Sequence, residues 1–293
     1  MRIFVTGASG WIGSAVVPEL ISAGHQVLGL ARSESSAKAV ADMGAEVLRG
    51  DLNDTDVLRA GALDNDGVIH LAYEHELGQI GGAPADAKAI ETFATALAGS
   101  GKPLVISGAT IVVPGRPATE RDELIAQGPI AARIRNMQTA LAAAARGVRS
   151  SLVMLPRSVH GRGERHGLVP QLIAMARAKG VSGYIGDGAS RWPAVHVKDA
   201  AALYRLAVEQ APSGAVLNAV GDEGVPLREI AEVIGRHLNV PARSLPAEDY
   251  NSVLVPLLST DMPASSSLTR ELLSWKPAYP GLVEDIEQGH YFT

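Results

Sequence analysis

Three glycines near the start of the chain have the spacing of a phosphate-binding turn. Gly7, Gly10 and Gly13 follow an apolar, strand-like run, and an apolar helical pattern continues from Ile12. A first glycine allows a sharp turn, a second lets the backbone approach a phosphate, and a third lets the helix pack closely on the strand. The start of that helix offers backbone N–H groups and a positive dipole end. The stretch, Trp11 included, therefore predicts a dinucleotide pyrophosphate site.

The elements that position these glycines alternate between strand and helix, which predicts a parallel sheet covered on both faces. The predicted strands are 2–6, 26–30, 45–49, 67–72, 103–107, 151–155 and 215–219. The predicted helices are about 11–23, 34–42, 55–60, 85–99, 130–146, 168–179, 198–210 and 227–238. We expect an α/β protein with a doubly wound Rossmann sheet.

The regular alternation of strands and helices ends after residue 155, so a boundary between two parts of the chain is expected there. Residues 1–155, completed by about 194–222, form the predicted dinucleotide-binding domain. Residues 156–193 and 223–293 form a small, discontinuous C-terminal substrate-binding part. Ligands of such folds bind beyond the carboxyl ends of the strands, which is where candidate residues are sought.

Composition excludes several classes of function. The chain has 293 residues, 46% of them hydrophobic, and a net charge of -5, so a sizeable core is expected and nucleic acid is not an expected partner. Cysteine is absent, which excludes disulfides and thiolate chemistry. No apolar segment of about 20 residues predicts a membrane span. Since no span is predicted, we expect a cytoplasmic protein. The eight histidines lack metal-ligand spacing and no Gly-x-Ser-x-Gly elbow occurs, so neither a metal nor a serine nucleophile is expected.

Later motifs resemble, in order and spacing, those of the extended or atypical branch of the short-chain dehydrogenase/reductase superfamily, whose cofactor signature matches residues 6–13. They are Gly50-Asp51-Leu52, His70-Leu71-Ala72, residues 106–110, residues 156–161 and residues 191–200. Residues 273–277, Leu-Ser-Trp-Lys-Pro, are similar to the ending of sugar-nucleotide epimerases and dehydratases. The resemblance covers nearly the whole chain and implies a nicotinamide cofactor.

One departure from the family is decisive. The family's catalytic pair is Tyr-x-x-x-Lys on the helix after the fifth strand, and the usual spacing puts the Tyr near Pro129 and the Lys near Arg133. Residues 117–150 contain neither Tyr nor Lys. Any proton donor must therefore lie elsewhere.

The tip of the second strand predicts which cofactor binds. NAD-selective relatives carry an acidic residue there, whereas this chain has Arg32 and Ser33. A guanidinium can hold a 2′-phosphate through paired hydrogen bonds, which favours NADP(H) over NAD(H). The alternative is a solvated Arg32 before a helix capped by Ser33. The resemblance implies that Asp51 and Leu52 flank the adenine, although Asp51 would also serve as a turn cap.

Leu71 and Ala72 are expected to line the cofactor at the end of the fourth strand, and Tyr73 follows them. Tyr73 is therefore the first candidate for a relocated acid, with packing as the alternative. Arg133 would replace the missing Lys electrostatically, or bind an anion or a neighbouring carboxylate.

Ser107 and Thr110 follow the fifth strand, where the resemblance implies a hydroxyl that polarises the substrate oxygen. Gly108 occupies the family's own position for that hydroxyl. The alternative for both side chains is a turn hydroxyl bonded to backbone.

Three residues are candidates for the substrate pocket: His160, Tyr184 and Arg191. His160 stands where relatives have a Tyr and can transfer protons near neutral pH. Arg191 stands where sugar-nucleotide relatives bind a diphosphate. Tyr184 either lines the pocket or packs the small domain.

These features predict an NADP(H)-dependent oxidoreductase that reduces a carbonyl or a conjugated C=C of a small organic molecule. The alternatives are a sugar-nucleotide epimerase or dehydratase, and a redox-inactive regulator that senses NADP(H). A homodimer is compatible with either class.

Overall fold

The computed structural model covers residues 1–293 and describes all of them except 75–80, 129 and 253. Its largest sheet has seven parallel strands in the order β10-β6-β5-β4-β1-β2-β3. The strands are β1 (Arg2–Thr6), β2 (Gln26–Ala31), β3 (Glu46–Arg49), β4 (Gly67–His70), β5 (Pro103–Ala109), β6 (Arg149–Leu155) and β10 (Ala215–Asn218). The strand order reverses between β1 and β4, so a crevice is expected at the carboxyl ends of these two strands.

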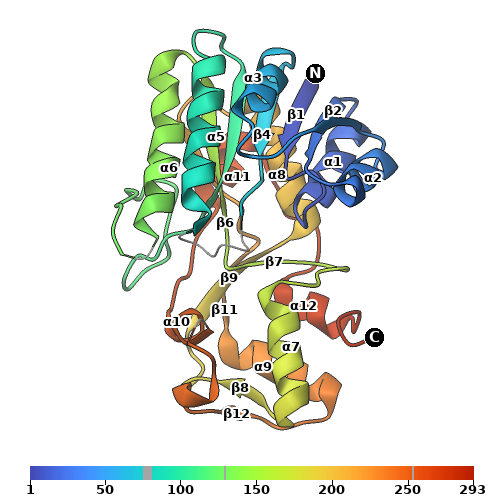
Figure 1. The fold of residues 1–293 in the computed structure, drawn as a ribbon. Helices are drawn as coiled ribbons and strands as arrows, with labels where there is room; N and C mark the ends of the chain where they lie inside the picture. The colour runs from blue at the N-terminus through green and yellow to red at the C-terminus, as the bar shows by residue number, and fades with distance from the viewer. Residues whose placement is uncertain (75–80, 129, 253) are drawn as a thin grey trace.

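Helices cover both faces of this sheet (Figure 1). On one face lie α1 (Gly13–Ser22), α2 (Glu34–Asp42) and α8 (Val197–Gln210), and on the other α3 (Thr55–Leu63), α5 (Ala83–Ala96) and α6 (Ala131–Ala142). Apolar side chains at helical spacing create these contacts, such as Val16, Val17 and Leu20 of α1 and Ile90 and Phe93 of α5. The apolar face of each helix thus fixes it on the sheet.

The C-terminal part lies beyond the carboxyl ends of the strands (Figure 1). It contains a three-stranded sheet of β11 (Asp222–Pro226), β9 (Arg191–His196) and β7 (Ser158–His160), and a two-stranded sheet of β12 (Ala242–Ser244) and β8 (Ser182–Tyr184). Its helices are α7 (Leu168–Lys179), α9 (Leu227–Leu238), α10 (Leu254–Ser259) and α12 (Leu282–Glu287), while α11 (Ser267–Leu273) packs on β10. A separate apolar cluster around the fully buried Trp192 holds this part together.

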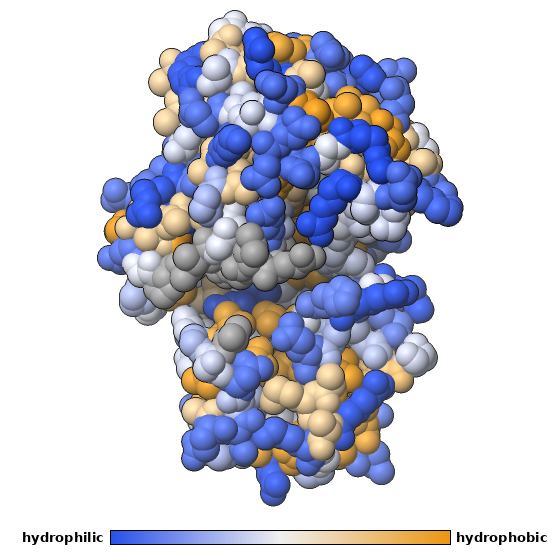
Figure 2. Space-filling view, in the orientation of Figure 1, coloured by the Kyte–Doolittle hydropathy of each residue, from blue (hydrophilic) through white to orange (hydrophobic). Residues whose placement is uncertain are grey.

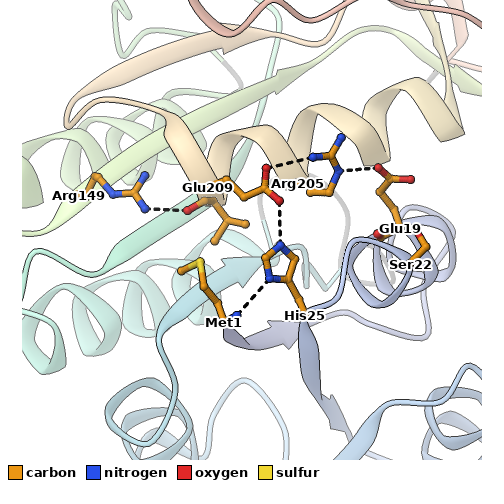
Figure 3. Close-up of polar contacts among 8 residues, drawn as sticks. Met1, Glu19, Ser22, His25, Arg149, Arg205 and Glu209 are labelled. Carbon is orange, nitrogen blue, oxygen red and sulfur yellow. Dashed lines mark hydrogen bonds and ion pairs between the residues drawn. The ribbon is translucent and has the colours of Figure 1, made fainter.

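The amino edge of the large sheet is held by polar contacts between α8 and the start of the chain (Figure 3). Arg205 pairs with Glu19 at 2.7 Å and with Glu209 at 3.0 Å, and Glu209 also contacts His25 at 2.8 Å. Arg149 donates to backbone carbonyls at the end of α8. These ties lie at the opposite end of the strands from the expected crevice and leave the carboxyl edge open for ligands.

The predicted fold class is confirmed, because the large sheet is parallel, covered on both faces and Rossmann-like. Some differences are in element ends: α1 begins only at Gly13, β4 ends at His70, and α6 gives way to a 3-10 turn over Ala143–Arg146. The elements that were not predicted are all short, since three to seven residues give too little periodicity. They are the strands β7, β8, β9, β11 and β12 and the helices α10, α11 and α12. No helix in the described ranges is long and apolar enough to cross a membrane.

Candidate functional site

The glycine turn is shaped by close backbone contacts at its first and third glycines. Gly7 has φ 68°, and a Cβ there would lie 2.7 Å from the backbone nitrogen of Ala72. A Cβ on Gly13 would lie 2.2 Å from the carbonyl oxygen of Gly7. A Cβ on Gly10 would meet only that same oxygen, at 3.2 Å, with nothing else within 4 Å. Gly7 and Gly13 are therefore needed by the turn itself, whereas Gly10 borders open space suited to a phosphate.

The first turn of α1 is suited to an anion. Ile12 occupies the N-cap position and makes no side-chain hydrogen bond to the helix, and the first turn contains no acidic residue. The N–H groups of Ser14 and Ala15 donate to the carbonyls of Gly10 and Ile12, so the helix start offers a ligand its positive dipole end and the N–H groups that precede Ser14. The Trp11 indole donates from Nε1 to the carbonyl of Val159 at 2.7 Å, which fastens this loop to β7.

Arg32 and Ser33 lie, as predicted, at the tip of β2, and both are exposed. Ser33 caps α2 by accepting from the backbone N–H of Ser36. Arg49, which sequence reasoning missed, donates from Nη1 to the carbonyl of Ser33 at 2.7 Å and pairs with Glu34. The signal that could have found it is register, because Arg49 stands opposite Ala31 at the ends of adjacent parallel strands.

The two residues predicted to flank an adenine have different environments. Asp51 is exposed and accepts the backbone N–H of Asn53 at 2.7 Å, so it does form a turn cap and keeps its second carboxylate oxygen for other partners. Leu52 is 7% exposed and packs in the apolar cluster beneath the edge of the sheet.

A chain of buried polar groups fixes the end of β4. The backbone N–H of Ala72 donates to Thr6 Oγ1 at 3.3 Å, and Thr6 Oγ1 lies 2.7 Å from His70 Nδ1. His70 Nε2 lies 3.2 Å from Asp86, whose other oxygen accepts from Asn136 at 2.6 Å. In the tautomer in which His70 Nε2–H donates to Asp86, Nδ1 accepts from the Thr6 hydroxyl. The chain links β1, β4, α5 and α6 at one point, and it sets the position of Leu71 and Ala72.

Tyr73 and Arg133, both predicted catalytic residues, are brought together by the fold. The Arg133 guanidinium lies over the Tyr73 ring, 4.6 Å from its centroid. A Cβ on Gly82 would lie 2.7 Å from the same ring, so glycine makes room for it. Burial raises the pKa of the Tyr73 hydroxyl, the charge of Arg133 lowers it, and the charge of Asp86 raises it. Pro129, the position expected for the family's Tyr, lies outside the described residues.

The two candidate hydroxyls at the end of β5 differ in their partners. Ser107 Oγ donates to the carbonyl of His70 at 3.0 Å and lies 2.7 Å from the hydroxyl of Tyr204, which is fully buried. Thr110 is 6% exposed, and its Oγ1 has no hydrogen-bond partner among the described residues. A buried hydroxyl without a partner is costly, so of the two hydroxyls Thr110 is the one with an unmet hydrogen bond among the described residues.

The three predicted substrate residues each have a different partner in the C-terminal part. His160 is fully buried, with Nδ1 2.9 Å from Asp285. The Tyr184 ring lies under the guanidinium of Arg228, 5.4 Å from its centroid. Arg191 is paired with Asp261 at 2.8 Å, and a second contact between their side chains makes the pair bidentate. The charge of Arg191 is therefore already compensated.

Titratable groups that sequence reasoning missed surround His160. Tyr291 donates to Glu164 at 2.6 Å, and burial raises the pKa of Glu164 to about 7 despite that hydrogen bond. His196 stands beside His160 across the β7–β9 pair, and burial lowers its pKa to about 4, with the charge of His160 adding to the effect. Buried acids and histidines thus lie in contact beneath the loop that follows β7.

The late motifs noted in the sequence have a structural reason. The Asp199 carboxylate accepts the backbone N–H groups of Ala278 and Tyr279 at 2.8 and 3.1 Å, and the Trp275 indole donates to the Asp199 carbonyl at 3.1 Å. The two motifs therefore lock the C-terminal segment to the start of α8. They stabilise the fold rather than touch the expected crevice.

The two parts meet at the carboxyl edge of the large sheet, where the crevice is expected (Figure 1). Figure 2 shows the molecular surface narrowing there, with apolar residues of the C-terminal part along its border. Leu71, Ala72 and Tyr73, at the end of β4, are partly buried at this level.

Comparison with known proteins agrees with this arrangement. The model of the NAD dependent epimerase/dehydratase family matches residues 3–219. An uncharacterized protein of Saccharomyces cerevisiae is 42% identical over 297 residues, covering 99% of either chain. The 2-alkyl-3-oxoalkanoate reductase of Stenotrophomonas maltophilia is 28% identical over 259 residues, covering 82% of this chain and 77% of its own. A solved structure of dTDP-glucose 4,6-dehydratase from Streptomyces venezuelae with NAD and TYD bound has a TM-score of 0.79 at 18% identity, covering 99% and 96% of the two chains.

Proposed function

The chain belongs to the NAD dependent epimerase/dehydratase family, whose members are enzymes of the extended short-chain dehydrogenase/reductase superfamily and use a nicotinamide cofactor. We propose that it is an NADP(H)-dependent reductase, which reduces a carbonyl or a conjugated C=C in a small organic molecule. The observation that carries the proposal is the contact between Tyr73 and Arg133 at the carboxyl edge of the sheet. It supplies a phenol and a cation, the two groups that the family's Tyr-x-x-x-Lys would supply. A reductase relative, named for an oxoalkanoate substrate, supports the same reaction class.

The residues of the chain divide the chemistry among them. A dihydronicotinamide cofactor, held by the glycine turn at Gly7, Gly10 and Gly13, would supply the hydride. The Thr110 hydroxyl, buried and without a described partner, hydrogen-bonds the substrate oxygen. Tyr73 is protonated at neutral pH, as phenols are, and it donates that proton to the oxygen as the C=O double bond becomes a single bond. Burial raises the pKa of Tyr73 and so weakens it as an acid, an effect that the charge of Arg133 opposes. The Arg133 charge stabilises the phenolate that remains.

Preference for NADP(H) is supported by the cations at the end of β2 and β3. Arg32 is exposed at the position where an acid would bind the ribose 2′-OH of NAD. Arg49 lies close by through its hydrogen bond to the Ser33 carbonyl, although Glu34 compensates part of its charge. Arg32, which precedes Ser33, and Arg49, which bonds its carbonyl, together suit a 2′-phosphate better than a neutral 2′-OH.

The proton donor is tested by removing only the Tyr73 hydroxyl. NADPH consumption is measured against a panel of aldehydes, ketones, imines and enones, and Tyr73→Phe is expected to lower kcat on the best substrate about 10²–10⁴-fold without changing the Kd for NADPH. Tyr279→Phe is the matched control, because it removes a hydroxyl from another tyrosine whose ring lies under a cation, with Lys198 5.2 Å from the ring centroid. Tyr279 differs in being 47% exposed and in stacking on His196. Wild-type turnover by Tyr73→Phe would show that Tyr73 only packs against the ligand.

The same panel separates the rivals. NADPH binding without turnover of any compound supports a redox-inactive regulator, which the absence of Tyr and Lys from residues 117–150 favours. A sugar-nucleotide epimerase or dehydratase is disfavoured, because the pairing of Arg191 with Asp261 leaves no uncompensated charge there for a diphosphate.

A further inference from the structure

Arg157 lies at the carboxyl edge of the sheet, in the two-residue connection between β6 and β7. Leu155, the last residue of β6, accepts the backbone N–H of Thr110 through its carbonyl at 2.9 Å. Arg157 is therefore two residues from the backbone that holds Thr110, a span of at most about 7 Å between Cα atoms. Figure 1 shows this connection between the large sheet and the C-terminal part.

The side chain of Arg157 is partly buried, yet its described acceptors are one backbone carbonyl and one thioether. Its Nη1 donates to the carbonyl of Leu257 at 3.2 Å, and its Nε donates to the Met262 sulfur at 2.9 Å, which Nη2 also contacts. A thioether is a poor acceptor, and a guanidinium has five N–H donors. In the described ranges no carboxylate lies within ion-pair distance of Arg157, so its positive charge is not compensated there.

Arg149, the first residue of β6, shows how a buried arginine is normally accommodated. Arg149 is also partly buried and also lacks a carboxylate partner among the described residues, but it donates to the carbonyls of Val208 and Ala211 at 2.7 and 3.0 Å. These carbonyls form the C-terminal end of α8, whose dipole is negative (Figure 3). Arg157 meets only one such carbonyl, that of Leu257 in the last turn of the six-residue helix α10, and the Trp192 indole donates to the same oxygen at 3.0 Å.

An uncompensated cation in a partly buried site is unfavourable unless an anion joins it. Burial lowers the pKa of Arg157 to about 10, so the side chain is still charged at neutral pH. The protein as a whole carries a net charge of -5, which works against non-specific attraction of anions. A retained cation at this place therefore points to a ligand.

We infer that Arg157 binds a carboxylate or phosphate group of the small molecule that reacts beside Thr110. The planar fork of a guanidinium matches both groups through two parallel hydrogen bonds. A ligand with a few atoms between its reacting oxygen and its anionic group can reach both side chains. The part of the inference that concerns reaction rests on the proposed function, whereas the anion site itself does not.

The anion site is tested without cofactor. Thermal unfolding of the wild type is followed in sodium acetate, sodium phosphate and sodium chloride at equal ionic strength. We expect acetate or phosphate to raise the Tm above its value in chloride, because a ligand that binds the native state stabilises it. The larger of the two shifts identifies the anionic group.

Two methionine variants on β6 and its connection give opposite expectations. Arg157→Met should lose the anion-dependent rise and, in chloride, be at least as stable as the wild type, since an uncompensated cation is replaced by an apolar chain. Arg149→Met should be less stable in chloride, because helix-end carbonyls lose their donors, yet keep the anion-dependent rise. Absence of the rise in the wild type, its retention in Arg157→Met, or a loss of stability in Arg157→Met equal to that of Arg149→Met would each overturn the inference.

Substrate recognition is tested separately with 3-oxobutanoate and its methyl ester as paired probes. NADPH-dependent reduction of the acid should show a KM at least about tenfold higher in Arg157→Met, while the KM of the ester is unchanged. Equal effects on acid and ester would overturn a role in substrate recognition. If neither probe turns over although the anion-dependent rise in Tm depends on Arg157, the proposed reductase activity on such substrates fails and the anion site stands.

Discussion

The three glycines of the first turn should respond to alanine in different ways, although their spacing makes them look equivalent. In Gly13→Ala the new Cβ would lie 2.2 Å from the carbonyl oxygen of Gly7, and in Gly7→Ala it would lie 2.7 Å from the backbone of Ala72. In Gly10→Ala its nearest described neighbour is at 3.2 Å. The first two changes therefore act on the fold, and the third acts on the space left for a pyrophosphate.

The magnitudes follow from these distances. Overpacking against backbone costs about 1–3 kcal/mol or more, so Gly13→Ala should lower the free energy of unfolding by roughly 3 kcal/mol. Gly7→Ala adds about 1–2 kcal/mol for a left-handed conformation at φ 68° to its own overlap. Gly10→Ala needs a shift of only a few tenths of an ångström and should cost less than about 1 kcal/mol. Its Cβ would displace the phosphate, and losing one charge-assisted contact of about 1.5–3 kcal/mol lowers affinity by about one to two decades.

Two measurements on each variant separate the effects. Urea unfolding gives the change in stability, and calorimetric titration with NADPH at a temperature where all variants are folded gives the change in affinity. Gly10→Val extends the series with a larger side chain at the same position and should abolish binding while the protein stays folded. Full affinity in Gly10→Val would show that the motif is only a turn, and equal destabilisation by Gly10→Ala and Gly13→Ala would refute the steric reasoning.

Two further predictions concern charge. Arg32→Ala should lower the affinity for NADPH by about one to two decades and leave that for NADH nearly unchanged, so equal losses for both cofactors in parallel titrations would remove Arg32 from the 2′-phosphate site. Burial raises the pKa of Glu164 from 4.5 to about 7, so the native state binds this proton more tightly than the unfolded state, and stability falls as pH rises from about 4.5 to 7. At about 1.4 kcal/mol per pKa unit, the free energy of unfolding falls by roughly 3 kcal/mol over this pH range. Glu164→Gln should abolish this fall, and the new amide oxygen can still accept the hydrogen bond from Tyr291. The pKa of His196 is lowered to about 4, so its contribution to stability rises with pH up to about 6.5 and opposes that of Glu164. The test is therefore the difference in unfolding free energy between the wild type and Glu164→Gln, measured from pH 4 to 8. A difference that stays constant over this range would contradict the reasoning.

Local patterns were sufficient to predict the fold because the sheet is built from regular, well-separated elements. The predicted helices at 34–42, 168–179 and 227–238 coincide with α2, α7 and α9, where apolar spacing and flanking residues agree. The C-terminal part was harder to predict, because β8 and β12 have three residues each and pair with each other across about 60 residues of sequence. No local pattern carries that pairing.

The site divides along the same line. Its glycine turn lies within one strand–turn–helix unit, so the sequence alone predicts which residues form it and why. The contact of Tyr73 with Arg133 depends instead on α6 lying beside α5, and the two residues are separated by a whole strand and helix. The sequence does contain a signal for the contact between these two helices. Asp86 and Asn136 are polar residues at buried positions of α5 and α6, and they form a hydrogen bond with each other. Buried polar residues on two predicted helices require partners, so such pairs predict where helices meet and where a site assembled from distant segments will lie.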